Sequence, residues 1–221
     1  MGTKLGNGVY GFREAARLTG LKGERVREWF RIRNDDARRH PVFNSDYQPV
    51  NGDRAISFFD LIDVFVAGQL REHGVSLQTL RRVYSRLQAE FNAKHPFCRS
   101  ELLSDGKSVF LRGMDRKGEE ELKEVLTRQK VFPTIILPFL RKIDYGQVSK
   151  QAERWHIAEQ VIIDPSICFG KPVVEDINIP TAVLASAYRA NDKDEELVGE
   201  WYNIHPKYVL AAVAFEDSMA A

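Results

Sequence analysis

The sequence has few cysteines and no long apolar run. Its two cysteines, Cys98 and Cys168, are too few for a disulfide framework. The most apolar stretch, residues 135–140, contains Pro138 and is far shorter than a membrane span. The first residues, MGTKLGNG, lack the apolar core of a signal peptide. We therefore expect a cytoplasmic protein with no membrane partner.

The sequence also lacks the common motifs of enzyme and metal sites. It contains no GxGxxG, GxxxxGK[ST] or HExxH. Cys98 follows His95 as H-x-x-C, but no second pair with metal-ligand spacing accompanies it. Asp35 and Asp36 lie close to arginines in sequence, which is more typical of surface charge than of a catalytic pair. We expect no enzyme activity, no catalytic residue, no metal and no cofactor, and we expect Cys168 in the core.

Charge is nearly balanced overall but is unevenly distributed along the chain. The net charge is +1. Between Arg13 and His40, nine lysines and arginines accompany five acids, whereas between Ala190 and Ala221 two bases accompany seven acids. The basic N-terminal region suits phosphate. An acidic C-terminal face is more often simply solvated, but it also suits a basic partner.

Residues 10–30, YGFREAARLTGLKGERVREWF, predict two helices joined by a tight turn. Ala16 permits close approach of the helices, and Gly20 permits a positive φ in the turn. Val26 and Trp29 then return to the core. A small residue, a glycine four positions on and apolar residues at +10 and +13 are typical of a DNA-binding helix-turn-helix. An ordinary pair of antiparallel helices is the alternative.

Residues 31–57 predict a wing. Short strands at residues 41–43 and 55–57 are expected to pair with each other, and Asn51-Gly52 is a strong turn signal ahead of the second strand. The alternative is a loose surface loop.

The pattern of helix and hairpin signals continues after the wing. Residues 58–91 predict two helices separated by Gly74, with Ser76 as the N-cap of the second and His95-Pro96 ending it. A hairpin around residues 102–111, a charged helix over residues 118–130 and a short apolar helix near residues 133–142 are expected next.

The C-terminal residues predict a small β-hairpin followed by a three-helix bundle. The expected segments are strands at 161–163 and 173–174, and helices from Pro180 to Ala190, over 195–202 with Asp192 and Glu195 as a capping box, and from Pro206 onward. The fold class is therefore mainly α with short β-hairpins.

Residues 1–112 resemble the MerR family of winged-helix DNA-binding domains. The motifs that carry the resemblance are YGFREAARLTGLKGERVREWF, GDRAISFFDL and LREHGVSLQTLRRV. It implies that Lys22 and the arginines from Arg25 to Arg31 face the major groove, and that Arg54 is a wing arginine touching the DNA backbone. With the basic residues of the predicted wing, the candidate DNA-binding residues are Lys22, Arg25, Arg27, Arg31, Arg38, Arg39 and Arg54.

Residues 158–216 resemble a domain of unknown function found in antitoxins paired with PIN-type ribonuclease toxins. The matching pattern is IDP…GKPV…IPT…DEELVGEWY…YVLAAVAF. Chains that join both domains resemble VapB-type antitoxins. The resulting organisation is a DNA-binding domain over 1–112, a helical linker over 113–157 and a C-terminal antitoxin or oligomerisation domain over 158–221.

The two resemblances imply a type II antitoxin. Such a protein binds operator DNA, as an expected homodimer, to repress transcription of its own operon, and it neutralises a PIN-type toxin through surfaces that the sequence does not specify. The alternative is a stand-alone MerR-like transcriptional regulator whose residues 113–221 sense a ligand. A weaker alternative is an adaptor whose helix-turn-helix binds protein.

Overall fold

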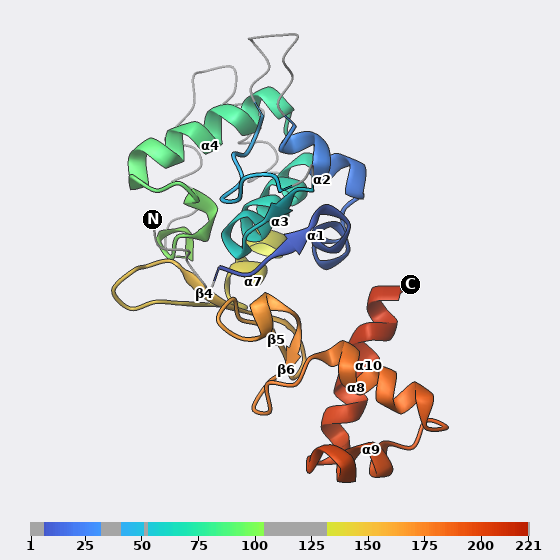
Figure 1. Ribbon diagram of the computed structural model, residues 1–221. Helices are drawn as coiled ribbons and strands as arrows, with labels where there is room; N and C mark the ends of the chain where they lie inside the picture. The colour runs from blue at the N-terminus through green and yellow to red at the C-terminus, as the bar shows by residue number, and fades with distance from the viewer. Residues whose placement is uncertain (1–6, 32–40, 51–52, 104–131, 221) are drawn as a thin grey trace. The chain divides into compact units, whose positions relative to one another are not determined.

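The chain forms two compact units. The computed structural model describes residues 7–31, 41–50, 53–103 and 132–220 (Figure 1). One unit is built from residues 10–152, and the other from residues 153–221 with the first nine. Several expectations lie outside the described residues: the turn at Asn51-Gly52, the candidates Arg38 and Arg39, the pair Asp35-Asp36, and the segments around 104–111 and 118–130.

The N-terminal unit begins with the predicted helix-turn-helix. Helix α1 spans Phe12–Thr19 and α2 spans Gly23–Trp29. Gly20 ends α1 with φ +71°, a left-handed conformation that glycine adopts without steric cost. The Leu21 amide donates to the Ala16 carbonyl at 2.8 Å, closing the turn. The prediction of two helices with a tight turn at Gly20 is confirmed.

The strand pairing predicted for the wing is wrong. Strand β2 (Ala55–Ile56) pairs antiparallel with β1 (Tyr10–Gly11), not with residues 41–43. The amides of Val42 and Phe43 instead donate to the Trp29 carbonyl at 2.8 and 3.2 Å. Phe43 is drawn inward because its ring packs among Trp29, Phe30 and Tyr84. Burial of this aromatic ring holds residues 42–43 against the end of α2 rather than beside residues 55–57.

We call residues 41–50 and 53–57 the wing segment. Val50 and Asp53 form an antiparallel bridge, with each amide donating to the other residue's carbonyl at 3.0 and 2.9 Å. The bridge spans the position where the sequence predicted a turn. The base of the wing segment pairs with β1.

Two long helices form the centre of the N-terminal unit. They are α3 (Phe58–Glu72) and α4 (Leu77–Phe91), each begun by a serine N-cap. Ser57 forms a capping box with Asp60, and the Ser76 hydroxyl accepts from Thr79 N. Helix α4 ends earlier than His95-Pro96, because Asn92 adopts a left-handed C-cap.

The end of the N-terminal unit is less helical than the sequence predicted. The 3₁₀ turn η1 (Pro96–Cys98) follows α4, and the π-helical segment η3 (Phe132–Ile136) leads into α7 (Leu137–Leu140). Strand β3 (Ile143–Tyr145) comes next, and β4 (Ala152–Ala158) begins where the unit ends. The expectation of a helical linker over 113–157 is thus wrong for residues 143–157, whose strands the sequence analysis missed.

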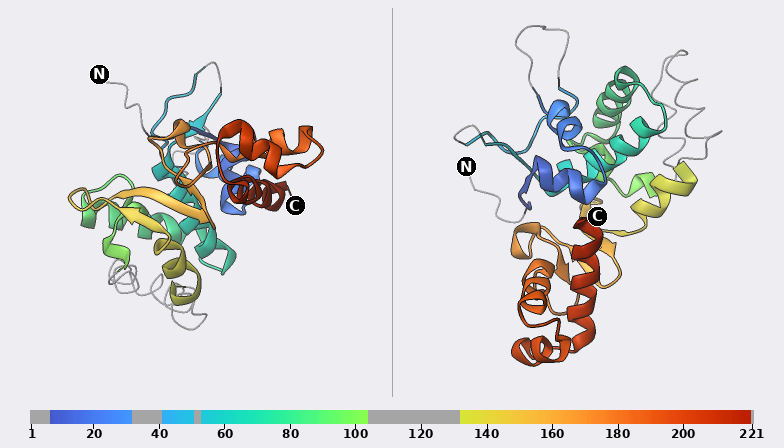
Figure 2. Two further views of the ribbon diagram at one scale, coloured as in Figure 1. Left: turned by 90° about the horizontal axis from the view of Figure 1, so that it is seen from below. Right: turned by 90° about the vertical axis from the view of Figure 1, so that its right-hand side faces the viewer.

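The C-terminal unit is a small sheet followed by three helices, as predicted. Strand β5 (Val161–Ile163) pairs antiparallel with both β4 and β6 (Val173–Val174), and the 3₁₀ turn η4 (Cys168–Gly170) lies between β5 and β6. Helices α8 (Thr181–Ala190) and α10 (Pro206–Ala220) lie side by side, with α9 (Glu195–Tyr202) across one end (Figure 2). The fold class, mainly α with short β-hairpins, is confirmed.

Apolar side chains fill the centre of the three-helix bundle. The fully buried members are Val174, Leu184, Val198, Val209 and Ala212. They come from β6 and from each of the three helices, so the hairpin and the bundle share one core. This core explains why the sequence pattern predicted the bundle correctly.

Two local predictions in this unit are wrong. Helix α9 is capped by Asp194, which accepts from Leu197 N at 2.9 Å, whereas Asp192 lies outside the helix with φ +54°. Cys168 is exposed rather than in the core, because it lies in a turn with φ +47°. Both cysteines are free.

Among the helices of the described chain, we found none with both the length and the apolar character that crossing a membrane requires.

Candidate nucleic-acid interface

Basic side chains gather around an open cavity of about 620 Å³ in the N-terminal unit. The cavity lies between the start of α1, the end of α2 and the wing segment. We call it the arginine cavity. Its lining residues are Gly11, Phe12, Arg13, Arg27, Arg31, Asp53 and Arg54.

The local structure explains why these arginines converge. Arg27 lies in the last turn of α2, and Arg31 follows just beyond the Phe30 C-cap of that helix; both line the cavity. Arg54 follows the bridge between Val50 and Asp53, and its Nη1 donates to the Phe30 carbonyl at 3.0 Å. This bond ties the wing segment to the end of α2. It places the three predicted residues Arg27, Arg31 and Arg54 around one cavity.

The chemistry of the arginine cavity suits an anion. Its lining residues include four arginines and a single acid, Asp53. Arginine binds phosphate with two parallel hydrogen bonds, which makes it the usual residue for contacts with nucleic-acid backbone. The start of α1 also lines the cavity, through Gly11, Phe12 and Arg13.

The other described candidates lie outside this cavity. Lys22 is the exposed N-cap residue of α2. Arg25 is half exposed and lies 3.4 Å from Glu72 of α3, a surface pair of small energetic value. Arg13 is the residue that the candidate set omitted, although it was counted in the basic N-terminal region.

A buried ionic cluster lies beneath the wing segment. We call it the aspartate–histidine cluster and define it as Asp46, Asp60, Asp63 and His95. His95 Nδ1 lies 2.8 Å from Asp63 Oδ2, and its Nε2 lies 3.2 Å from Asp46 Oδ1. His95 and Asp63 are 6% and 1% exposed, respectively. A histidine between two carboxylates acts as a double donor when both of its nitrogens carry protons.

Further donors satisfy the carboxylates of the cluster. Asp63 also accepts from the Tyr84 hydroxyl at 2.5 Å and from Phe97 N at 3.2 Å. Asp46 accepts from Lys94 Nζ at 2.5 Å and from the Ser57 hydroxyl at 2.6 Å. The cluster thus joins the wing segment, α3, α4 and η1.

Burial and charge oppose each other in setting the pKa values of this cluster. Burial lowers the pKa of His95, but hydrogen bonds to Asp46 and Asp63 outweigh it and raise that pKa to about 10. Burial likewise opposes ionisation of Asp46, yet donors from His95, Lys94 and Ser57 hold its pKa well below its usual range. Burial raises the pKa of Asp60 to about 6.

Burial also raises the pKa of Asp63, and His95 opposes this. Three donors converge on the two oxygens of Asp63, a pattern that an ionised carboxylate accepts. We therefore treat Asp63 and Asp46 as anions flanking a histidinium.

Three residues of the same cluster have the spacing of a metal site. Ligand atoms of Asp46, Asp60 and His95 lie within 4.8 Å of one another. However, His95 uses both ring nitrogens for hydrogen bonds, and Lys94 already supplies positive charge to Asp46. A bound cation would have to displace these donors. The residues present fit a histidinium better than a metal ion.

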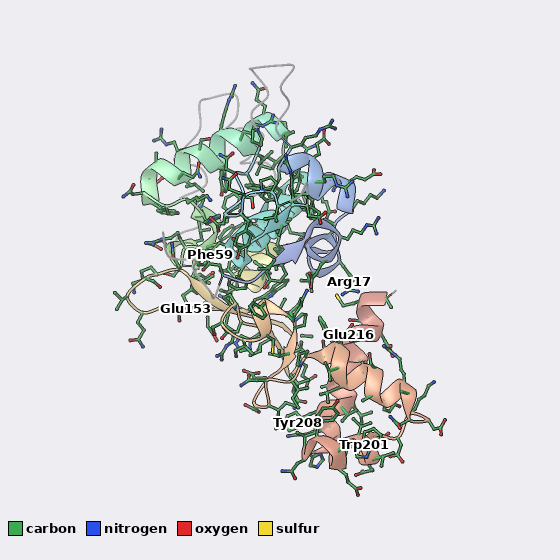
Figure 3. All side chains as sticks on the ribbon, viewed as in Figure 1. Arg17, Phe59, Glu153, Trp201, Tyr208 and Glu216 are labelled. Atoms are coloured by element: carbon green, nitrogen blue, oxygen red, sulfur yellow. The ribbon has the colours of Figure 1, made fainter. Side chains whose placement is uncertain are left out.

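The aspartate–histidine cluster left no signal in the sequence. Its members span positions 46 to 95, and His95 was considered only as a helix end and as part of H-x-x-C. Charged residues so far apart give no periodic pattern. Phe59, labelled in Figure 3, lies against the His95 ring with centroids 5.6 Å apart, a contact that only the folded chain reveals.

With this geometry established, comparison with known proteins adds three findings. Residues 161–215 match a family described as "Protein of unknown function (DUF433)". The chain is 22% identical over 193 residues to a Mycobacterium tuberculosis (strain ATCC 25618 / H37Rv) protein named "Putative antitoxin VapB45", covering 82% of this chain and 78% of that one. The two sequence matches indicate an antitoxin-like protein.

The fold also resembles a solved structure. The crystal structure of Rv2018 from Mycobacterium tuberculosis matches with a TM-score of 0.72 and 19% identity. The match covers 92% of this chain and 96% of that one. At this identity the likeness shows a shared fold and nothing about the ligand.

Proposed function

We propose that this protein is the antitoxin of a type II toxin–antitoxin system and acts by binding rather than by catalysis. In this proposal its N-terminal unit binds operator DNA in the manner of a MerR-like winged helix and represses the operon. Its C-terminal unit takes part in binding and neutralising a PIN-type ribonuclease toxin. The similarity to a named antitoxin supports the general role.

The observation that carries the DNA-binding part is the arginine cavity. Arg13, Arg27, Arg31 and Arg54 surround one opening, and three of them come from the helix-turn-helix itself or its end. A winged helix needs simultaneous contacts from a recognition helix and a wing. The bond from Arg54 to the Phe30 carbonyl joins those two parts. The proposal includes a homodimer, because a two-fold symmetric protein reads a palindromic operator.

The distribution of charge supports separate partners for the two units. Residues 10–152 contain 26 basic and 19 acidic residues, whereas residues 153–221 contain 5 basic and 12 acidic residues. An acidic surface repels DNA and suits the basic groove that an RNA-cleaving toxin needs for its substrate. We therefore assign DNA to the first unit and the toxin to the second.

The DNA contact is tested by titrating a labelled duplex from upstream of the protein's own gene. We expect Arg31→Ala and Arg54→Ala each to weaken binding by about 1–3 kcal/mol if they contact bases, or to reduce the salt slope by about 1 if they contact phosphate. Arg86→Ala is the matched control, because Arg86 is an exposed arginine on α4 outside the arginine cavity.

The control should bind as the unaltered protein does. Equal affinity and equal salt dependence in all variants would contradict the assignment of the arginine cavity to DNA. Absence of binding by the unaltered chain at any moderate salt would contradict DNA binding altogether.

A further inference from the structure

Side chains outside the wing segment hold its residue Asp46 in place. The Asp46 carboxylate accepts hydrogen bonds from Lys94 Nζ and His95 Nε2, and from the Ser57 hydroxyl within the segment. The Asp46 amide donates to Asp60 Oδ2 at 3.2 Å. One residue near the middle of the wing segment is thus fixed by donors and acceptors from two other parts of the N-terminal unit.

His95 extends this attachment into the centre of the helical core. Its second nitrogen bonds Asp63, a residue of α3 that also accepts from Tyr84 of α4. The histidine ring therefore links Asp46 of the wing segment to a carboxylate fixed by both long helices. Lys94 cannot provide this link, because its side chain is 48% exposed and its Nζ contacts only Asp46 and the Ser45 carbonyl among the described partners.

The wing segment has a second attachment at its other end. Arg54 Nη1 donates to the carbonyl of Phe30 at the end of α2. Together with the pairing of β2 with β1, these two attachments set where Arg54 lies relative to Arg27 and Arg31. Losing the attachment at Asp46 would leave residues 44–49 with the Ser45 hydroxyl, which donates to the Ala55 carbonyl at 2.8 Å, while the Val42 and Phe43 amides still donate to the Trp29 carbonyl on one side.

We propose that His95 is a positioning residue for DNA binding: by bonding Asp46 and Asp63 at once, it holds the wing segment on the helical core and so keeps Arg54 beside Arg27 and Arg31. This inference rests on the proposed DNA-binding function. His95 itself is buried and touches no DNA; it acts through Asp46.

The charge state of His95 is governed by all the groups around it. Asp46 faces it from the wing segment, Asp60 and Asp63 from α3, and Lys94 from the adjoining loop. Tyr84 and the Cys98 thiol remain neutral, because burial raises both of their pKa values. Three carboxylates thus favour the doubly protonated ring, and Lys94 is the one neighbouring cation among the described contacts of the cluster.

The test compares His95→Gln, Asp46→Asn and Lys94→Gln in the full-length protein. His95→Gln removes the link between the two carboxylates. Asp46→Asn removes only the negative charge that attracts His95. Because Asp46 is partly exposed, the Asp46→Asn protein should fold even if the His95→Gln protein does not. Lys94→Gln is the matched control, because it removes the exposed donor to the same oxygen. Hydrogen exchange of residues 42–57 and titration of a duplex from upstream of the gene are measured for each.

We expect exchange in residues 42–57 to increase roughly tenfold or more in His95→Gln and Asp46→Asn, with α3 and α4 unchanged in Asp46→Asn. We expect DNA affinity to fall roughly tenfold and the salt slope to decrease by about 0.9, the loss of one phosphate contact. A loss of stability alone would weaken binding without removing a particular phosphate contact. Lys94→Gln should change each quantity by less.

Unchanged exchange in a folded Asp46→Asn variant would overturn the proposal. Increased exchange with unaltered DNA affinity and salt slope would overturn the positioning role as well. If the unaltered protein binds no DNA, the proposed function and the positioning role both fail, while the exchange data still show separately whether His95 holds the wing segment.

Discussion

At the scale of single residues, the notable feature is a histidine that the fold keeps charged. An isolated buried histidine would lose its proton, since burial in a low-dielectric interior disfavours the charged form. Asp46 and Asp63 reverse this by accepting from both nitrogens of His95. Removing one member of a buried ionic cluster leaves its partners with an uncompensated buried charge, so the stability of each charge depends on the other members.

The first prediction concerns the pH dependence that this histidine imparts. The pKa of His95 is raised to about 10 in the folded protein, against about 6.5 in an unfolded chain. Its contribution to stability is therefore complete below about pH 6.5 and declines as pH rises toward 10. We expect His95→Gln to lower the free energy of unfolding by about 3–5 kcal/mol near neutral pH.

The measurement is urea unfolding of both proteins at pH 6, 8 and 10. The difference between them should be largest at pH 6 and shrink by pH 10. A difference that grows with pH would show that the ring is neutral in the folded protein. The matched control is Lys94→Gln, for which a small change is expected because Lys94 is half exposed.

At the scale of elements, helix ends and close approaches determine how the pieces join. Ser57 and Ser76 begin α3 and α4, as hydroxyl N-caps commonly do. In the C-terminal unit, Gly199 lies where α9 approaches the turn into α10. A Cβ at this position would lie 2.9 Å from the Ile204 carbonyl oxygen and 3.3 Å from Pro206 Cγ.

The second prediction follows from that approach. Gly199→Ala would force the turn between α9 and α10 to shift, because a backbone carbonyl cannot rotate away as a side chain can. We expect it to lower the free energy of unfolding by about 1–3 kcal/mol, as overpacked sites do. Calorimetry compares it with Ala214→Ser on the exposed side of α10, which should be within about 0.5 kcal/mol of the unaltered protein. An equally stable Gly199→Ala protein would contradict the close packing of this turn.

At the scale of the whole molecule, the two units carry opposite charge. The near-zero net charge of the chain hides this segregation. Trp201 on α9 is 58% exposed and lies among acids of the same helix, including Glu196 and Glu200. A large exposed aromatic within an acidic surface is typical of a protein-binding site, since tryptophan is enriched at interaction hot spots.

The third prediction tests the assignment of the toxin to the C-terminal unit. When the chain is co-expressed with the protein encoded beside it, we expect the two to co-purify. The double substitution Glu196→Lys and Glu200→Lys should weaken that complex through like-charge repulsion. It should not lower the affinity for DNA, because it adds positive charge. Glu159→Lys, an exposed acid elsewhere in the unit, is the control.

Failure of the unaltered chain to co-purify with the neighbouring protein would argue against the antitoxin role. Full retention of the complex by the double variant would instead place the toxin contact away from α9. Purification followed by mass measurement distinguishes the two results.

Much of the architecture followed from the sequence because it depends on local signals. The periodic apolar residues of α3 and α4, the turn at Gly20 and the core of the three-helix bundle all lie close together in sequence. Of the candidates that the resemblance and the basic wing residues supplied, Arg27, Arg31 and Arg54 line the arginine cavity, and their role in binding DNA stays a prediction.

Only the tertiary structure decided which distant groups meet. The pairing of β2 with β1 joins Tyr10 to Ile56, and the arginine cavity brings Arg13 of α1 together with Arg27 of α2. The contact between Asp46, Asp63 and His95 joins residues with no shared period. Local patterns specify helices and turns through short-range sterics and hydrophobicity, whereas a buried ionic cluster exists only once the core has brought its members together.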